Sequence, residues 1–212
     1  MLVPTMYQAA SPGQITAVVT GHPMAVLVTN GSPVPHATHL PVIPVADGNI
    51  RSGSTLWGHM NRANPHWRSL DAGTAGKLVF SGPGTYVCPV LYETEPAAPT
   101  WDFAVVHLSG RIIPIAPGEP TLAVVRRTAA TLEHAFGAGW DQNSSVDYFR
   151  ALEPGVGAFE FVVGDVEAMF KLSQEKEPAV RQRIMDDFAG TPRNGSVQVS
   201  RLMSELGLGI DS

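Results

Sequence analysis

The sequence predicts a mainly β, α+β fold, in which helices surround a β-barrel or curled antiparallel sheet. Glycine (21) and proline (18) are plentiful among the 212 residues and charged residues make up only 16%, which is typical of many short strands joined by tight turns. Short apolar runs separated by turn dipeptides fill the first half, whereas helical periodicity dominates after residue 118. We expect one domain over residues 1–212, with barrel strands in about 22–115 and 156–174 and helical additions in 118–153 and 177–208.

The first third of the chain predicts one helix followed by short strands. Ser11 is a suitable N-cap and Pro12 a suitable first residue for a helix over 12–20 that ends at Gly21. Strands are expected over 24–29, 36–45 and 54–60, with turns at 30–31 and 47–48. Pro41 and Pro44 confine the second strand to a sheet edge or a bulge. Residues 61–70 are expected to form a short helix or turn.

The remaining elements follow from the same patterns. Two strands, 77–80 and 85–91, are expected around the Ser-Gly-Pro-Gly turn at 81–84, followed by a long strand over 103–115 with a kink at Gly110. Apolar spacing predicts a helix over 119–136 with Gly137 as C-cap, and a shorter helix over 146–152. Strands over 157–163 and 168–173 precede two helices, one carrying Val180, Ile184 and Phe188 on one face and one over 199–206.

Composition excludes several classes of protein. No apolar run approaches the roughly 20 residues of a membrane-spanning helix, and the N-terminus lacks a secretory signal pattern. A single cysteine, Cys88, is compatible with a reducing cytoplasm. The net charge is −5 with no cluster of basic residues, which argues against direct binding to DNA.

Common catalytic and metal motifs are missing. His36 and His39 lie three apart on a strand, hence on opposite faces, and no carboxylate accompanies them, so no metal site is expected. Cys88 in mid-strand is more typical of an inert thiol than of a nucleophile, with a reactive thiol as the alternative. Gly-x-Ser-x-Gly, Gly-x-Gly-x-x-Gly and Walker patterns are absent. A phosphate would therefore need side chains from separate elements.

Two polar segments offer such side chains. Residues 56–70 hold two of the four tryptophans, two of the seven histidines, and Arg62, Asn64 and Arg68, and they predict the rim of a cofactor pocket. Residues 171–174 (Lys-Leu-Ser-Gln) offer a second polar set. The alternative for both is ordinary surface charge and core aromatics. Trp101, in the loop-like stretch 99–102, is expected to be a lid or an interface anchor.

Together these segments resemble a known family. The motifs run in order: His-Ala-Thr-His-Leu-Pro at 36–41, Leu-Trp-Gly-His at 56–59, Arg-Ala-Asn-Pro-His-Trp at 62–67, Phe-Ser-Gly-Pro at 80–83, Tyr-Val-Cys-Pro at 86–89, Pro-Thr-Trp at 99–101, Val-His at 106–107, Gly-Arg at 110–111 and Lys-Leu-Ser-Gln at 171–174. They are similar to the PaiB-like proteins, often called FMN-binding negative transcriptional regulators, from about residue 7 to about residue 188.

The resemblance implies an antiparallel, Greek-key-like FMN-binding split β-barrel, which in related families is a homodimer with the flavin at the subunit interface. It implies that Arg62 and Lys171 bind the phosphate. Side chains expected to bind the ribityl chain, the ring or its surroundings are Thr38, His39, His59, Asn64, Trp101, Ser173 and Gln174. Candidates for proton transfer are His39, His59, Asp102 and His107.

The chain departs from the family at Leu91, Asp102, Phe103 and Glu175, where tryptophan, asparagine, tyrosine and asparagine are common. These departures favour an altered substrate side of the pocket or a weaker flavin affinity. The first functional hypothesis is a flavin-dependent oxidoreductase acting on a small organic substrate. The alternatives are a regulator or metabolite sensor, and a barrel that catalyses a non-redox step such as a cyclisation.

Overall fold

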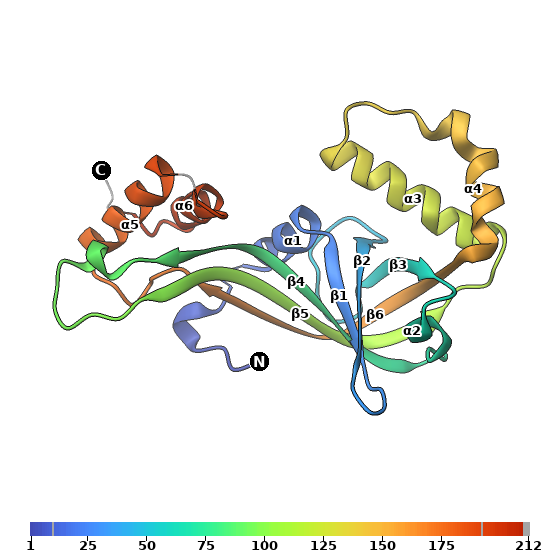
Figure 1. Cartoon of the computed structure of the whole chain (residues 1–212), viewed down its shortest axis with the longest axis horizontal. Helices are drawn as coiled ribbons and strands as arrows, with labels where there is room; N and C mark the ends of the chain where they lie inside the picture. Colours follow the sequence, from blue (N-terminus) through green and yellow to red (C-terminus); the bar gives the residue numbers. More distant parts are fainter. Residues whose placement is uncertain (10, 192, 210–212) are drawn as a thin grey trace.

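The structure, a computed structural model, describes residues 1–9, 11–191 and 193–209. Within them, six strands form a closed barrel in the order β1-β2-β3-β6-β5-β4, and every neighbouring pair is antiparallel (Figure 1). The strands are β1 (Met24–Thr29), β2 (His36–Pro44), β3 (Thr55–Asn61), β4 (Thr74–Val87), β5 (Thr100–Pro114) and β6 (Val156–Lys171). The expected mainly β class with peripheral helices is confirmed.

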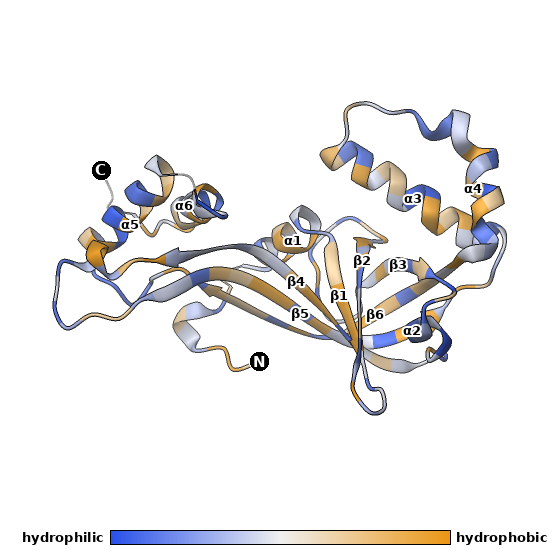
Figure 2. Cartoon of the chain, viewed as in Figure 1, coloured by the Kyte–Doolittle hydropathy of each residue, from blue (hydrophilic) through white to orange (hydrophobic). Residues whose placement is uncertain are grey.

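Alternation of side chains places a phenylalanine-rich core inside the barrel. Phe80, Phe159 and Phe161 are fully buried, and Figure 2 shows hydrophobic residues concentrated in the strands. Gly58 on β3 faces one of these rings, because an added Cβ would lie 2.5 Å from Cζ of Phe159. The absence of a side chain at position 58 therefore lets the large rings fill the barrel.

Strands β4, β5 and β6 extend beyond the barrel as a three-stranded arm. β1 pairs with β4 only at residues 76–79, and β3 pairs with β6 only at residues 156–162, whereas β5 continues alongside both long neighbours. The helices α5 (Pro178–Gly190) and α6 (Ser196–Glu205) lie over the end of this arm, on the left of Figure 1. The short helix η2 (Pro89–Tyr92) contacts α5 there.

Two strand predictions were wrong because each divided a long strand into two. The 81–84 segment is an irregularity inside β4, where the pairing with β5 shifts between Ser81 and Gly84. The segment between 163 and 168 belongs to β6, whose pairing with β5 shifts between Ser109 and Gly110. In both cases the neighbouring strand continues, so the extra residues are absorbed as a bulge rather than as a turn.

The prolines of β2 lie at the ends of its two pairings, each of which occupies only one side of the strand. β2 is an interior strand that pairs with β1 from His36 to Pro41 and with β3 from Val42 to Pro44. Each proline is the last residue of one of these pairings. A proline at the end of a pairing lacks an N–H where the inter-strand hydrogen bonds stop. It is therefore tolerated within a closed barrel.

The helices agree well with the sequence pattern. They are α1 (Pro12–Gly21), α2 (Pro65–Arg68), α3 (Glu119–Phe136) and α4 (Val146–Leu152), with short helices η1 (Thr5–Tyr7), η3 (Gln142–Ser145) and η4 (Glu153–Gly155). Ser11 and Gly137 are the expected caps. α3 contacts β2, β3 and β6. In the described ranges of the chain, no helix has the length and apolar character needed to cross a membrane.

Candidate functional site

The pairing between β2 and β3 is short, and the unpaired segments beyond it are called the β2–β3 gap. These strands pair only between Val42–Pro44 and Leu56–Gly58. Beyond that point β2 continues against β1 to His36, and β3 continues against β6 to Asn61. His39 and His59 lie on the two separating segments, and Arg62 follows the end of β3. The predicted pocket rim therefore borders a gap between two strands.

A polar network closes the barrel beside this gap. The His66 imidazole bonds Thr38 Oγ1 through Nδ1 (2.8 Å) and Thr29 Oγ1 through Nε2 (2.9 Å). Asn64 Nδ2 donates to the same Thr38 oxygen (3.2 Å), while Asn64 Oδ1 accepts the backbone N–H of His66 (2.9 Å). The side chains of Thr38 and Asn64, both expected to bind flavin, are thus bonded to each other directly, and each is also bonded to His66.

Arg62 keeps part of its guanidinium group available. Its Nε donates to the Val156 carbonyl (2.9 Å), and its Cζ lies 5.9 Å from the centre of the Trp67 ring. Within the described part of the chain, the two terminal amino groups of Arg62 have no protein partner. A half-buried guanidinium fixed at Nε with free terminal N–H groups is suited to a phosphate.

His59 has a buried atom without a partner. Its Nδ1 receives no hydrogen bond from the described residues, and burial lowers the pKa of the imidazole. The ring is therefore neutral at physiological pH, and one of its nitrogens remains to be satisfied. His59 Nδ1 and the terminal amino groups of Arg62 are therefore polar groups on and after β3 that lack a partner among the described residues.

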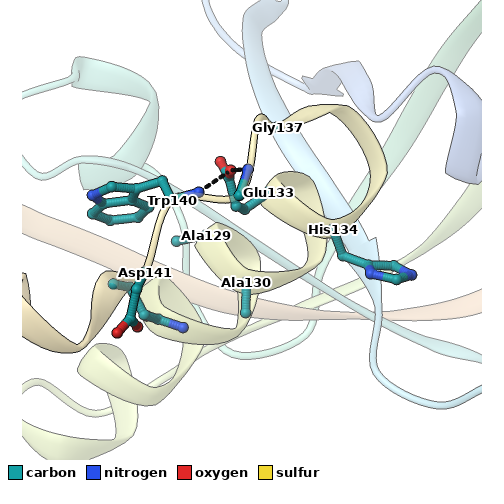
Figure 3. Close-up of a pocket in the computed structure, with 9 residues that line it drawn as sticks. Ala129, Ala130, Glu133, His134, Gly137, Trp140 and Asp141 are labelled. Carbon is teal, nitrogen blue, oxygen red and sulfur yellow. Dashed lines mark hydrogen bonds between the residues drawn. The ribbon is translucent and has the colours of Figure 1, made fainter.

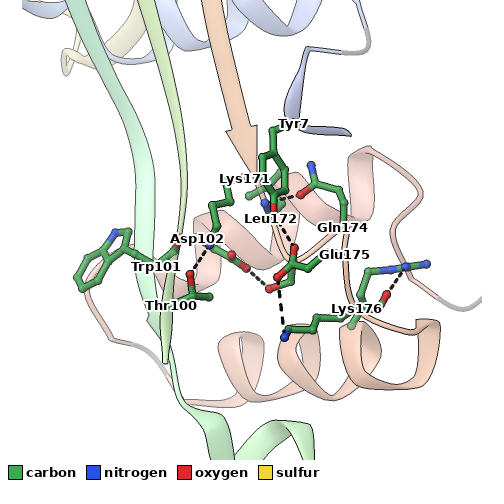
Figure 4. Close-up of polar contacts among 11 residues, drawn as sticks. Tyr7, Thr100, Trp101, Asp102, Lys171, Leu172, Gln174, Glu175 and Lys176 are labelled. Carbon is green, nitrogen blue, oxygen red and sulfur yellow. Dashed lines mark hydrogen bonds and ion pairs between the residues drawn. The ribbon is translucent and has the colours of Figure 1, made fainter. Parts of the chain in front are cut away.

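A second predicted set gathers at the far end of β5 and β6 (Figure 4). The Lys171 ammonium donates to Thr100 Oγ1 and to the Trp101 carbonyl, the latter at 3.1 Å. The Trp101 side chain is 49% exposed. Gln174 turns back onto its own loop, where Oε1 accepts the N–H of Leu172 (2.6 Å) and Nε2 donates to the Phe170 carbonyl (2.5 Å).

Asp102 points to the covered face of the arm, opposite Trp101. The expected loop at 99–102 is wrong, because β5 begins at Thr100 and successive side chains alternate between the two faces. Asp102 is fully buried, and Ser173 Oγ donates to its Oδ2 (2.7 Å), while Oδ1 has no hydrogen-bond partner among the described residues. Burial raises the pKa of this carboxyl to about 6, against the opposing effects of Ser173 and Lys171.

Tyr7 and Glu175 extend the polar cluster around Asp102. The Tyr7 hydroxyl donates to Glu175 Oε2 (3.0 Å), and burial together with this bond raises the Tyr7 pKa to about 12. Lys176 lies near both Glu175 and the Tyr92 ring, with its Nζ 4.1 Å from the ring centre. The N-terminal segment is thereby fixed to the loop that follows β6.

One chain does not bring the two predicted sets together. β6 runs from Val156, paired with Asn61, to Lys171, paired with Phe103. Fifteen steps along a strand span on the order of 45 Å, too far for one cofactor to contact both ends. His107 lies between them and pairs with Val79 and Glu167. Burial lowers the His107 pKa, and it belongs to neither set.

Three contributors were not predicted as site residues. His66 lies inside the 56–70 stretch, and its position two residues after Asn64 is a usable signal. Thr29 and Tyr7 form single long-range bonds. Nothing in their local sequence distinguishes them from ordinary strand and tail residues.

A separate cavity of about 450 Å³ lies at the C-terminal end of α3 (Figure 3). Its wall includes Glu133, His134 and Trp140. Glu133 Oε1 accepts the backbone N–H groups of Gly139 (2.8 Å) and Trp140 (2.7 Å), so its carboxylate is used to hold the loop. This cavity contains none of the predicted flavin-binding residues, and the β2–β3 gap remains the candidate site.

The barrel, with its partly unpaired strands and helical additions, has the antiparallel split-barrel fold. The flavocytochrome Anf3 from Azotobacter vinelandii has a similar structure (TM-score 0.53, 13% identity, 77% of this chain and 69% of that chain). So does the conserved hypothetical protein Rv2991 from Mycobacterium tuberculosis (TM-score 0.56, 13% identity, 84% and 94%). At these identities the likeness shows a shared fold.

The sequence of residues 1–165 matches the family described as "Putative FMN-binding domain", and the chain belongs to that family. The protease synthase and sporulation protein PAI 2 of Bacillus subtilis is 24% identical over 206 residues, covering 97% of both chains. An uncharacterized protein of Emericella nidulans, AN0679, is 23% identical over 246 residues, covering 98% of both. The resemblance drawn from the sequence is confirmed, and FMN is the cofactor that family membership assigns.

Proposed function

We propose that this protein is a homodimeric, FMN-dependent oxidoreductase that acts on a small organic substrate. The observation that supports the proposal is the placement of the two polar sets at opposite ends of β6. Each set holds part of what a flavin site needs, and a second copy can supply the missing part. In this arrangement the β2–β3 gap of one chain receives the arm of its partner.

The phosphate would be held mainly by Arg62. Its free terminal N–H groups can form the paired, charge-assisted bonds that suit a phosphate, while the bond from Nε to Val156 keeps the group oriented. The partner's Lys171 would add a second positive charge. His59, neutral because of burial, would bind a polar edge of the cofactor without adding charge.

FMN supplies the redox chemistry when bound, accepting and delivering a hydride at its ring. The protein then has to exclude water, orient the substrate and move one proton. The partner's Trp101 is suited to covering the ring because half of its surface is exposed in one chain. His39, exposed at the border of the gap, is the first candidate for proton transfer, since an imidazole has one nitrogen that can accept and one that can donate a proton.

Flavin titration tests the binding site. Arg62→Ala is expected to raise the Kd for FMN by about 10- to 100-fold, as loss of a charge-assisted bond to phosphate predicts, in a fluorescence-quenching assay. Arg127→Ala, which changes an exposed arginine on α3, is the matched control and should bind FMN normally. Protein that neither carries a flavin absorption band nor binds added FMN would refute the proposal.

Complementation tests the shared site. Arg62→Ala and Lys171→Met variants should each bind FMN weakly. Heterodimers formed by co-expressing the two should contain one intact site, built from the unchanged Arg62 of one chain and the unchanged Lys171 of the other. Recovery of half the flavin stoichiometry is the expected result. A site contained within one chain would give no recovery, because every chain would carry one defect.

A regulatory role is the second candidate, because the relative from Bacillus subtilis is named for protease synthesis and sporulation. Since the chain is acidic and lacks a basic cluster, such regulation would act through flavin or metabolite state rather than through DNA contact. Salt-sensitive, sequence-specific retardation of DNA in a gel-shift assay would contradict this view. Absence of turnover with any reductant, combined with tight FMN binding, would favour it over the enzyme.

A further inference from the structure

The His66 side chain is the most completely engaged polar group beside the proposed flavin site. It is only 2% exposed, and both ring nitrogens bond threonine hydroxyls, one from β1 and one from β2. The His36 ring stacks on it with 5.1 Å between ring centres. One imidazole therefore joins β1 and β2 to the start of α2.

The network has a consistent direction of donation when His66 is neutral. Asn64 Nδ2–H donates to Thr38, the Thr38 hydroxyl donates to Nδ1, and Nε2–H donates to Thr29. In this arrangement the Thr38 hydroxyl both accepts and donates, and the Thr29 hydroxyl accepts. A protonated ring would donate from both nitrogens, so the Thr38 hydroxyl would lose its acceptor and would have to accept from both sides.

The network ends next to the phosphate-binding candidate. Asn64 follows Arg62 by two residues in the turn between β3 and α2, where the Asn64 N–H bonds the Asn61 carbonyl (3.0 Å). Asn64 also caps the backbone of His66 (2.9 Å). The Arg62 side chain is oriented by its bond to the Val156 carbonyl, and the turn that follows Arg62 is fixed to Thr38 through Asn64 and His66.

We propose that His66 is a positioning residue for FMN: it locks Thr38 and Asn64 together, and thereby holds the turn that carries Arg62 in its binding orientation. The inference rests on the proposed FMN function and deepens it, because Thr38 and Asn64 then stabilise the turn that carries Arg62 rather than serving as the main ligands of FMN. It also makes flavin affinity depend on the protonation of His66. His36 is the titratable group stacked on His66, and the contacts from β1 and from the turn, Thr29 and Asn64, are uncharged.

The sign of this dependence follows from the surroundings of the ring. Burial, and secondly the neighbouring His36, lower the pKa of His66, so the neutral form and the intact network are present at pH 8. Acidification protonates the ring and breaks the Thr38 donation. FMN affinity should therefore fall as the pH is lowered through the acidic range.

The test compares wild type, His66→Gln and Ser200→Ala by FMN titration at pH 8 and pH 5.5, with a thermal melt of each. Glutamine retains one donor and one acceptor but cannot titrate in this range. Ser200 Oγ donates to the Met185 carbonyl (2.9 Å) at the far end of the molecule, so Ser200→Ala removes a comparable buried bond without touching the site. The phosphate of FMN also changes its charge between these two pH values. This change is the same in the measurements on all three proteins, so it cancels when they are compared.

We expect His66→Gln to raise the Kd about 10-fold at pH 8 and to show a much smaller further loss at pH 5.5 than wild type does. Ser200→Ala should follow wild type in affinity at both pH values. Equal affinity and equal pH dependence of His66→Gln and wild type would overturn the inference, as would an equal loss in Ser200→Ala. If wild type itself fails to bind FMN, the proposed function fails first.

Discussion

The buried carboxyl of Asp102 gives a direct physical test of the structure. A carboxyl group whose pKa rises from 3.8 to about 6 on folding disfavours the folded state once it is ionised. The folded protein then binds more protons than the unfolded chain between these pH values, so stability falls as the pH rises through this window. The loss is complete above the folded pKa and amounts to about 3 kcal/mol.

Asp102→Asn removes this charge while keeping an oxygen that can accept the Ser173 hydroxyl. We expect the variant to be more stable than wild type by about 1–3 kcal/mol at pH 8 and nearly equal to it at pH 4. The gain is below the full value because an amide accepts a weaker bond from Ser173 than a carboxylate does. Urea denaturation from pH 4 to pH 8, followed by tryptophan fluorescence, measures the difference.

Asp165→Asn is the control, because Asp165 is an exposed carboxylate on the neighbouring strand. Its stability should follow wild type at every pH. If Asp102→Asn and wild type also remain parallel over the whole range, then the Asp102 carboxyl does not have the raised pKa that its burial predicts. A variant less stable than wild type at pH 8 would show that the ionised carboxylate is stabilised by partners around Oδ1.

The remaining predictions concern packing and the exposed aromatic residue. Gly58→Ala should lower the unfolding free energy by about 2–3 kcal/mol, because its Cβ would meet Phe159 and Leu40; in the same urea assay, Gly21→Ala, where nothing lies within 4 Å, should not destabilise the protein. Trp101→Ala should lower the unfolding free energy by only about 1–2 kcal/mol, because about half of the residue is already exposed, but it should weaken FMN binding in the titration. A large stability loss in Trp101→Ala would place this ring in the core of one chain.

The helices were predictable because their signals are local. Apolar spacing and glycine placement determined α3 within the sequence itself, and its observed bounds, Glu119–Phe136, match. The strand errors have the opposite origin. Whether Gly82 and Pro83 form a turn or a bulge depends on whether β5 continues beside them, and the pairing of Ser81 and Gly84 with β5 is information that no window of sequence contains.

The same limit, that contacts between distant segments cannot be read from a local stretch of sequence, explains which parts of the two polar sets were predictable. Lys171 and Ser173 are near in sequence, so their common location was predictable, and Asp102 followed from the resemblance. The bond between Thr29 and His66 depends on the barrel closing β1 against β2. Likewise, the opposite faces of Trp101 and Asp102 follow from the start of β5 at Thr100, which the proline-rich stretch before it concealed.

The length of β6 connects the fold with the proposed function. Residues 156–162 close the barrel against β3, while residues 163–171 extend past it with β5 as their neighbour. A strand that only closed the barrel would end near Val163. Lys171 would then not lie at the end of a three-stranded arm. The additional length holds Trp101 and Lys171 away from the barrel of their own chain. Such an arm has a function at a flavin site only if it reaches the β2–β3 gap of another copy, so heterodimer complementation is the decisive test of the proposed function.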